Sequence, residues 1–231
     1  MRTPSLAVLA GILMIPLATP ASAVDLSSEA GVVSRYRDRG LALSEGATIQ
    51  ASITADHETG AYLNLWGSTL AAIGELDQSE VDVSIGYARE LTGRVSIDAY
   101  ATYILYPSIS DADYVELTAV TSMLIGPASA SLGISLAPAQ HGVRDDLGRK
   151  TANLYLFAAG EVPLPRTPIK IRATIGRERG PFDATANDGK WDWSLGSEIE
   201  FDPLRAGIGY VGSNADTGNR HGIVGSLFVT W

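Results

Sequence analysis

The sequence predicts an all-β protein, a transmembrane antiparallel up-and-down β-barrel of about 12 strands with both termini in the periplasm. Three observations support this fold class. An export signal opens the chain, and apolar and polar residues alternate with a period of two over most of its length. Long and short connections also alternate between the predicted strands.

Residues 1–23 have the pattern of a cleaved signal peptide. Arg2 supplies a positive charge, Leu6–Leu17 is apolar, and Ala21-Ser22-Ala23 provides the small residues of a cleavage site. The apolar stretch is too short to span a bilayer. We therefore expect cleavage after Ala23, export from the cytoplasm, and a single outer-membrane β-barrel domain over residues 24–231.

Composition excludes several classes of protein. The chain contains no Cys, which excludes a lipoprotein anchor, disulfides and thiolate chemistry. The formal net charge of −9 argues against a nucleic-acid partner. After Ala23 no run approaches the roughly 18 consecutive apolar residues of a transmembrane helix. Insertion into a membrane would therefore need strands.

Period-two alternation, bounded by Gly, Pro, Asp and Asn, defines the expected strands. They lie near Glu29–Arg37, Ala47–Asp56, Ala61–Ser68, Ser79–Arg89, Arg94–Leu105, Asp113–Ile125, Ala128–Ala137, Thr151–Glu161, Ile169–Arg177, Trp191–Phe201, Leu204–Gly212 and Gly222–Trp231. The alternation predicts which residues face lipid and which face the lumen in every strand except Glu29–Arg37.

The connections sort by length. The odd-numbered links are long: Asp38–Gly46, Thr69–Gln78, Tyr106–Ala112, Pro138–Lys150, Glu178–Lys190 and Ser213–His221. The even-numbered links are short: His57–Gly60, Glu90–Gly93, Gly126–Pro127, Val162–Pro168 and Asp202–Pro203. Long loops at one end and tight turns at the other are typical of an outer-membrane barrel. A soluble β-sandwich, the main alternative, has no reason to sort its loops in this way.

The last strand is predicted to close the barrel. From Ile223 to Trp231 the odd-numbered residues are expected to face lipid, and the even-numbered residues from Val224 to Thr230 the lumen. An apolar strand that ends on an aromatic residue fits an interfacial aromatic and resembles the signal that outer-membrane assembly machinery reads. We expect that machinery to be a partner during biogenesis.

Two sets of residues are predicted to act in a membrane barrel. A charge on the lipid face would cost about 2–4 kcal/mol, so charged strand residues should line the lumen. The predicted pore-lining residues are Glu80, Asp82, Arg94, Asp98, Glu116, Lys170, Arg172, Asp192, Glu198, Glu200 and Arg205. The predicted membrane-interface aromatics are Tyr103, Trp191, Trp193, Phe201, Tyr210 and Trp231.

The charged lumen has two interpretations. Lys170 and Arg172 are expected to face Asp192, Glu198 and Glu200, and opposed basic and acidic walls would orient and filter small solutes in a narrow pore. Alternatively, an interior salt-bridge network would plug the barrel, because about 12 strands lies between filled and open barrels. We favour the conducting pore.

Chemistry in the loops is the weaker hypothesis. His57 is expected in a short turn, and His141 and His221 in loops at the opposite end, where they could join an acid as in outer-membrane hydrolases. The acids in question are Asp145, Asp146 and Asp216. No Gly-x-Ser-x-Gly elbow is present. We therefore expect no enzyme and no catalytic residues.

Loop acids could also bridge Ca²⁺ or Mg²⁺ to lipopolysaccharide phosphates. They are Asp111, Asp113, Asp145, Asp146, Asp183, Asn187-Asp188-Gly189, Asp216 and Asn219. None has an EF-hand spacing, and turn chemistry is the favoured explanation. No metal and no cofactor are expected.

Several motifs in the first half of the chain are typical of a known family. They are Ser34-Arg35-Tyr36-Arg37-Asp38-Arg39-Gly40 with Ser44, His57-Glu58-Thr59-Gly60-Ala61-Tyr62 with Trp66-Gly67-Ser68, Glu80-Val81-Asp82-Val83-Ser84-Ile85-Gly86-Tyr87, Tyr103 to Tyr106-Pro107, and Tyr114-Val115-Glu116-Leu117. With these motifs the sequence resembles the TorF family of proposed bacterial porins, most clearly over Val33–Gly133. Arg37-Asp38 departs from the apolar residues that the family pattern has before Arg39-Gly40. The resemblance implies an outer-membrane barrel more than a particular transported molecule.

Together these observations predict a porin-like channel in the outer membrane of a Gram-negative bacterium, for passive diffusion of small hydrophilic solutes. Outer-membrane lipid and lipopolysaccharide are its expected surroundings. The alternative is a non-conducting barrel with a structural or surface-binding role, and an outer-membrane hydrolase is the less favoured third hypothesis.

Overall fold

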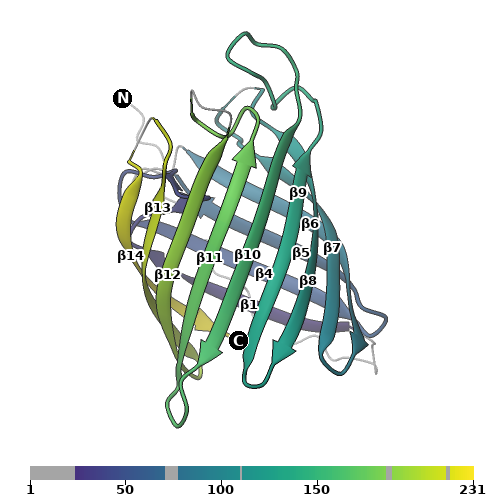
Figure 1. Ribbon diagram of the computed structural model, residues 1–231, viewed down its shortest axis with the longest axis vertical. Coiled ribbons are helices and arrows are strands. Elements are labelled where there is room, and N and C mark those ends of the chain that lie inside the picture. The colour runs from purple at the N-terminus through teal and green to yellow at the C-terminus, as the bar shows by residue number, and fades with distance from the viewer. Residues whose placement is uncertain (1–23, 71–77, 110, 186–188, 217–218) are drawn as a thin grey trace, which may run out of the picture.

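Twelve strands form one closed antiparallel barrel in the computed structural model, which describes residues 24–70, 78–109, 111–185, 189–216 and 219–231 (Figure 1). Each strand pairs with its neighbours in the chain, and the first barrel strand pairs with the last. The predicted fold class is confirmed. The described residues include no helix of the length and hydropathy needed to cross a membrane.

The barrel strands are mostly nine to fourteen residues long. They are β1 (Val24–Val33), β4 (Thr48–His57), β5 (Ala61–Thr69), β6 (Ser79–Thr92), β7 (Val95–Leu105), β8 (Tyr114–Ile125), β9 (Ala128–Ala137), β10 (Asn153–Pro163), β11 (Ile169–Arg179), β12 (Lys190–Phe201), β13 (Leu204–Ser213) and β14 (His221–Thr230). Two short strands, β2 (Arg37–Asp38) and β3 (Leu41–Ala42), form a separate hairpin between β1 and β4.

The sorting of connections is as the sequence predicts. Long loops gather at one end of the barrel and short turns at the other (Figure 1). The start of β1 and the end of β14 both lie at the short-turn end, since Val24 pairs with His57 and Glu29 with Thr230. That this end faces the periplasm stays a prediction. Most of the predicted link Thr69–Gln78 lies outside the described residues.

The first strand differs from its predicted position. It runs over Val24–Val33 rather than Glu29–Arg37. Its facing is also settled, because Glu29 forms an ion pair with Arg205 inside the barrel, while Leu26 on the other face is 59% exposed. Two consecutive serines and a luminal Gly31 hide the alternation in the sequence.

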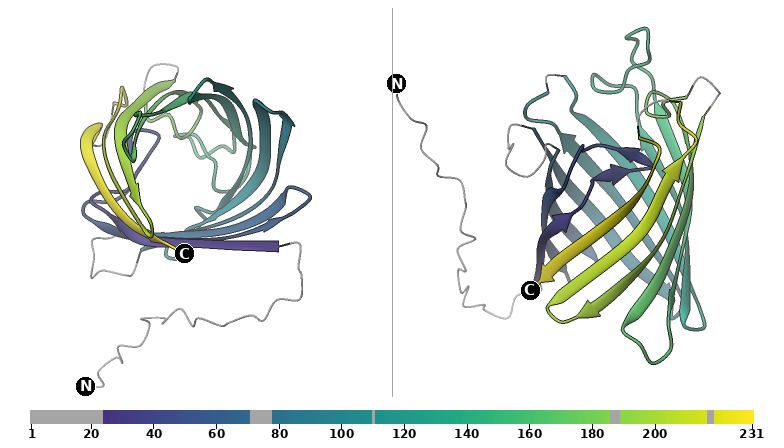
Figure 2. Two further views of the ribbon diagram at one scale, coloured as in Figure 1. Left: turned by 90° about the horizontal axis from the view of Figure 1, so that it is seen from below. Right: turned by 90° about the vertical axis from the view of Figure 1, so that its left-hand side faces the viewer.

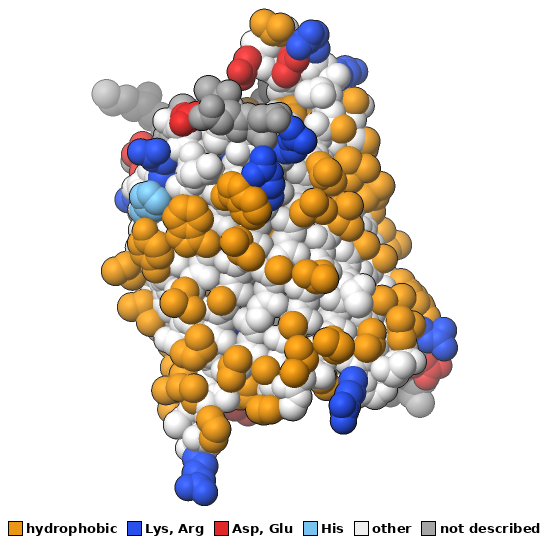
Figure 3. Space-filling model, viewed as in Figure 1, with side chains coloured by type: hydrophobic (Ala, Val, Ile, Leu, Met, Phe, Trp, Pro, Cys, Tyr) orange, Lys and Arg blue, Asp and Glu red, His pale blue; other side chains and the backbone are white. Residues whose placement is uncertain are grey.

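The barrel has an apolar outside and a polar inside. Ile85, Leu132 and Ile223 are 66%, 68% and 71% exposed on the outer face. Inside, Glu80 and Glu116 are 4% and 8% exposed. A belt of hydrophobic side chains crosses the outer face, and charged side chains gather at its two ends (Figure 3). This is the reverse of the usual order in a globular protein.

The seam between β1 and β14 closes the barrel with the fewest main-chain pairs. It has five register pairs, from Glu29 with Thr230 to Val33 with Ser226, whereas β1 and β4 have ten. Trp231 extends the seam by exchanging two main-chain hydrogen bonds of 3.0 Å with Ser28.

A glycine at this seam allows close approach of the two strands. A Cβ atom on Gly31 would lie 2.2 Å from the carbonyl oxygen of Leu227 and 2.5 Å from the ring of Phe228. The Phe228 ring is 7% exposed, and the Arg205 guanidinium lies 4.7 Å from its centroid. Phe228 thus fills the luminal space that Gly31 leaves.

We predict that Gly31→Ala destabilises barrel closure, because the added methyl group meets main-chain atoms that cannot move independently. Overpacking of this kind costs about 1–3 kcal/mol. The folded fraction on heat-modifiable gel electrophoresis and the thermal unfolding midpoint measure the effect. Gly225→Ala in β14 is the matched control, since its Cβ would have no atom within 4 Å. Equal behaviour of the two variants would contradict this account of the seam.

Candidate functional site

The chain leaves the barrel wall after β1 and turns into the lumen. Residues 34–47, here called the luminal hairpin, carry β2 and β3. Figure 2 shows these two strands crossing the upper part of the barrel. The turn between them has positive φ at Arg39 (44°) and Gly40 (83°), the combination that favours a tight two-residue hairpin. The sequence predicts a long loop here but not its position inside the barrel.

Arg39 at the tip of the luminal hairpin is held by two strands. Its guanidinium lies 2.5 Å from the Glu116 carboxylate of β8 and 2.9 Å from that of Glu178 in β11. It also lies 4.3 Å from the ring centroid of Tyr155. Burial alone would lower the pKa of Arg39, but attraction to Asp38, Glu116 and Glu178 outweighs it and raises the pKa well above its ordinary value.

Other contacts fix the base of the hairpin on one side. The Tyr36 hydroxyl donates a hydrogen bond of 3.1 Å to Glu80 of β6. The Tyr36 ring packs 5.5 Å from the ring of Trp66 in β5. The luminal hairpin is therefore anchored to this wall as well as to β8 and β11.

Arg37 and Gly40 fix the hairpin on the other side. Arg37 donates hydrogen bonds of 2.7 Å and 2.9 Å to the main-chain carbonyls of Asn219 and His221. Gly40 packs against β13, where a Cβ atom would lie 2.6 Å from that of Ser213. The luminal hairpin consequently spans the lumen from β5 and β6 to β13 and β14.

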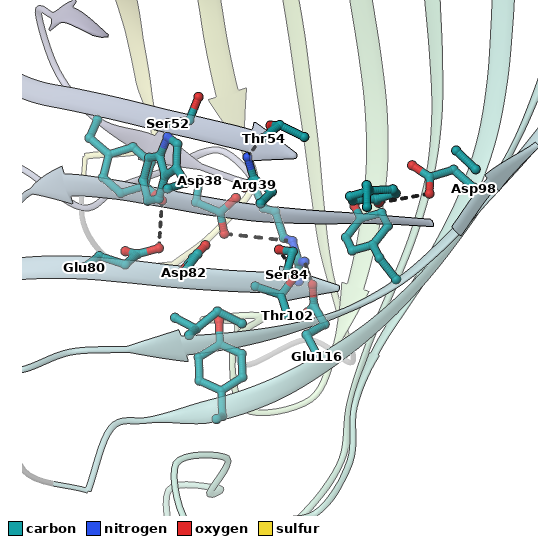
Figure 4. A pocket seen from close by; sticks show the side chains of 18 of the residues that line it. Asp38, Arg39, Ser52, Thr54, Glu80, Asp82, Ser84, Asp98, Thr102 and Glu116 are labelled. Atoms are coloured by element: carbon teal, nitrogen blue, oxygen red, sulfur yellow. Dashed lines mark hydrogen bonds and ion pairs between the residues drawn. The ribbon is translucent and has the colours of Figure 1, made fainter. Parts of the chain in front are cut away.

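A cavity of about 670 Å³ lies on the β4–β8 side of the hairpin (Figure 4). We call it the acidic cavity, because its lining contains six carboxylates and one guanidinium, a formal charge of −5. The charged lining residues are Asp38, Arg39, Asp56, Glu80, Asp82, Asp98 and Glu116. A smaller cavity of about 320 Å³ lies between the hairpin and β10–β13.

Aromatic side chains complete the lining of the acidic cavity: Tyr36, Tyr62, Trp66, Tyr100, Tyr106 and Tyr114. The Tyr62 hydroxyl donates a 3.0 Å hydrogen bond to Asp98. Four of the predicted pore-lining residues, Glu80, Asp82, Asp98 and Glu116, lie in this wall. Arg94 instead lies exposed in the turn between β6 and β7, away from the acidic cavity.

The predicted basic wall is paired with acids of its own. Lys170 lies 2.8 Å from Glu200. Arg172 lies 2.6 Å from Glu161 and 3.0 Å from Glu198. The basic side chains of β11 are therefore matched locally by carboxylates of β10 and β12.

Arg205 joins the same network, 2.9 Å from Glu198 and paired with Glu29 of β1. Three cations thus lie among four glutamates. The expectation that Lys170 and Arg172 also face Asp192 is wrong, because Asp192 is opposite Gly176 in the register. Asp192 accepts a 3.0 Å hydrogen bond from the Tyr155 hydroxyl.

The structure contains a buried ion pair, near the end of the barrel that carries the long loops, that the sequence analysis does not predict. Glu178 and Lys190 lie 2.6 Å apart, and both side chains are 1% exposed. Asn153 donates a hydrogen bond of 3.0 Å to Glu178. Extending the alternation of β11 by one residue beyond the predicted end at Arg177 would place Glu178 on the luminal face with Lys170 and Arg172.

The predicted interface aromatics lie near strand ends. Tyr103, Trp191, Phe201, Tyr210 and Trp231 are between 41% and 59% exposed. Trp193 is less exposed, and its ring centroid lies 5.9 Å from that of His221.

His141 lies in a loop, and His221 is the first residue of β14 rather than part of a loop as predicted. His141 lies 3.0 Å from Asp111 through one ring nitrogen and 2.8 Å from Arg144 through the other. His221 packs against Tyr210 and Trp193. Among the described residues no group of three or more His, Asp or Glu is arranged to hold a metal ion. Asn187 and Asp188 lie outside the described residues.

Comparison with known proteins gives a family and a fold. A family model described as "Bacterial protein of unknown function (Gcw_chp)" matches residues 17–226. The resemblance to the TorF family is not confirmed by this match. None of the curated proteins matches this sequence.

Three solved structures illustrate the similarity of fold. A KdgM porin has a TM-score of 0.61 at 9% identity, over 89% of this chain and 98% of that chain. A NanC porin has 0.59 at 11% identity, over 89% and 98%. The COG4313 outer membrane channel from Pseudomonas putida F1 has 0.54 at 11% identity, over 92% and 96%. At these identities the likeness concerns the barrel alone.

We predict that Arg39→Met releases the luminal hairpin, because Glu116 then stays buried without its cation. Removing one partner of a buried ion pair costs about 3–5 kcal/mol. Hydrogen exchange of the amides in residues 37–42 should become faster. The control is Arg149→Met, which removes an ion pair between an Arg149 side chain that is 72% exposed and Asp145 in a loop. Unchanged exchange in Arg39→Met would mean that this ion pair does not hold the hairpin.

Proposed function

The chain belongs to the Gcw_chp family, and because the function of that family is unknown, we propose from the barrel itself that this protein is an outer-membrane channel for passive diffusion of small hydrophilic solutes. The observation that carries the proposal is the reversed polarity of the closed barrel. Its outer face is apolar, and its interior holds a polar cavity of about 670 Å³. A lipid bilayer is the environment that such a surface fits.

The similar structures support this proposal. Two are porins and one is an outer membrane channel, and each is covered almost completely by the alignment. None is described as an enzyme, and we propose no catalytic activity for this chain. Export by a cleaved signal peptide, contact with lipopolysaccharide and folding by the outer-membrane assembly machinery follow from the same proposal.

The luminal hairpin would set the width of the channel. It crosses the lumen and divides the space into the acidic cavity and the smaller cavity beside β10–β13. The six carboxylates of the acidic cavity would favour cations over anions, because a wall of one charge raises the local concentration of the opposite charge.

The same hairpin supports a second candidate, a non-conducting barrel. Arg39 is almost buried and forms two ion pairs, so the hairpin could act as a fixed plug. The barrel would then serve a structural or surface-binding role through its long loops.

Planar-bilayer recordings test the proposal. We predict single-channel steps for the purified wild-type protein, and larger steps when residues 37–42 are replaced by Gly-Gly, because the shortened link no longer spans the lumen. If the folded wild-type protein gives no single-channel current steps, the proposed channel function is wrong. Steps only in the shortened variant would favour the plugged barrel.

A further inference from the structure

We propose that the acidic cavity is a binding site for a small organic cation, an amine or guanidinium compound that can also form hydrogen bonds. The inference rests on the proposed channel function and names the class of solute. It depends on three features of the cavity: unpaired carboxylates, carboxylate oxygens without a donor, and aromatic faces beside them.

The carboxylates of the acidic cavity exceed its cations. Among the described residues that line it, Arg39 is the one basic residue, and its guanidinium is already engaged by Glu116 and Glu178. In the part of the chain that the structure describes, Glu80 and Asp82 form no ion pair. These two acids lie two residues apart on β6 and face the cavity together (Figure 4).

Their hydrogen bonding is incomplete. Glu80 is 4% exposed, and its Oε1 accepts a hydrogen bond from Tyr36. Glu80 Oε2 and Asp82 Oδ1 are buried and accept no hydrogen bond from the described residues. A carboxylate oxygen that is removed from water without gaining a donor is unfavourable. A ligand with N–H donors beside these two carboxylates would supply the missing charge.

Aromatic rings give the site a preference for organic cations. Trp66 and Tyr36 pack against each other at 5.5 Å, and both line the cavity with Tyr106. Cations bind favourably over such ring faces. Arg39 shows the same recognition within this protein, since its guanidinium lies against two carboxylates and 4.3 Å from the Tyr155 ring.

Size and geometry argue for an organic ligand over a bare metal ion. The cavity of about 670 Å³ is within the range of about 300–1,000 Å³ that small-molecule sites occupy. Among the residues described, no three acids or histidines converge as a metal site requires. The formal charge of −5 disfavours anionic solutes.

Isothermal titration calorimetry of the full barrel in detergent tests the site, with agmatine as the cationic probe and glutarate as the anionic one. We expect agmatine to bind and glutarate not to bind. The double variant E80Q/D82N should bind agmatine about tenfold more weakly or worse. E161Q/E200Q is the matched control, because it removes the same charge from the lumen outside the acidic cavity, and its affinity should equal that of the wild type.

Heat-modifiable electrophoresis establishes that both variants are folded before they are compared. Binding of glutarate as tight as that of agmatine, or equal losses in the two double variants, would overturn the proposal, because either result indicates non-specific attraction. Absence of agmatine binding to the folded wild-type protein would also overturn it.

Bilayer recordings separate this inference from the proposed function. Agmatine should interrupt the wild-type current and leave the current of E80Q/D82N uninterrupted. Conductance without calorimetric binding would support the channel function and contradict the cation site. Suppose instead that the barrel does not conduct but binds agmatine in a way that E80Q/D82N abolishes. That result would support the cation site and contradict the channel function.

Discussion

Main-chain hydrogen bonding at the β1–β14 seam is the constraint on which the rest of the structure depends. In a lipid bilayer, where we propose that this barrel lies, a sheet cannot leave its edges unpaired, so the first strand must meet the last. β1 supplies only five pairs and stops at Val33, which leaves the upper part of β14 paired with β13 but without a strand on its other side. Ser34 and Arg37 fill this gap by bonding to Gly225 and to the carbonyl of His221. The early end of β1 and the inward turn of the chain are therefore coupled, because residues of the turn make the hydrogen bonds to β14 that a longer β1 would make.

The inward turn then determines how luminal charge is arranged. It carries Arg39 to Glu116 and Glu178, and Lys190 balances the second of these acids. Glu116, Glu178 and Lys190 are buried and Arg39 is nearly so, and an unpaired charge in such a place would be strongly destabilising. Near the other end of the barrel a separate group of three cations and four glutamates balances itself. Glu80 is left outside both networks, and this imbalance gives the acidic cavity its chemistry.

Local pattern and tertiary pairing explain which parts of this arrangement the sequence predicts. Apolar and polar residues alternate along each strand. This local pattern predicts that Glu80, Asp82 and Glu116 face the lumen, where all three line the acidic cavity. Arg39 pairs with residues 77 and 139 positions away, and nothing in residues 34–47 encodes those partners. The Arg39-Gly40 pair predicts a turn but not its direction. The register of Asp192 was missed because one strand's alternation does not fix its stagger against the next.

The hairpin and the acidic cavity depend on each other through Glu116. Glu116 lines the cavity; one oxygen of its carboxylate binds Arg39, and the other is buried without a donor among the described residues. A cation bound beside Glu80 and Asp82 would repel the Arg39 guanidinium. It would also compete with Arg39 for electrostatic attraction to the Glu116 carboxylate. Such repulsion is reciprocal: a bound cation that weakens the contact between Arg39 and Glu116 is itself bound more weakly, by the same free energy, while that contact is intact. Solute affinity and the width of the lumen are then linked by a single side chain on β8.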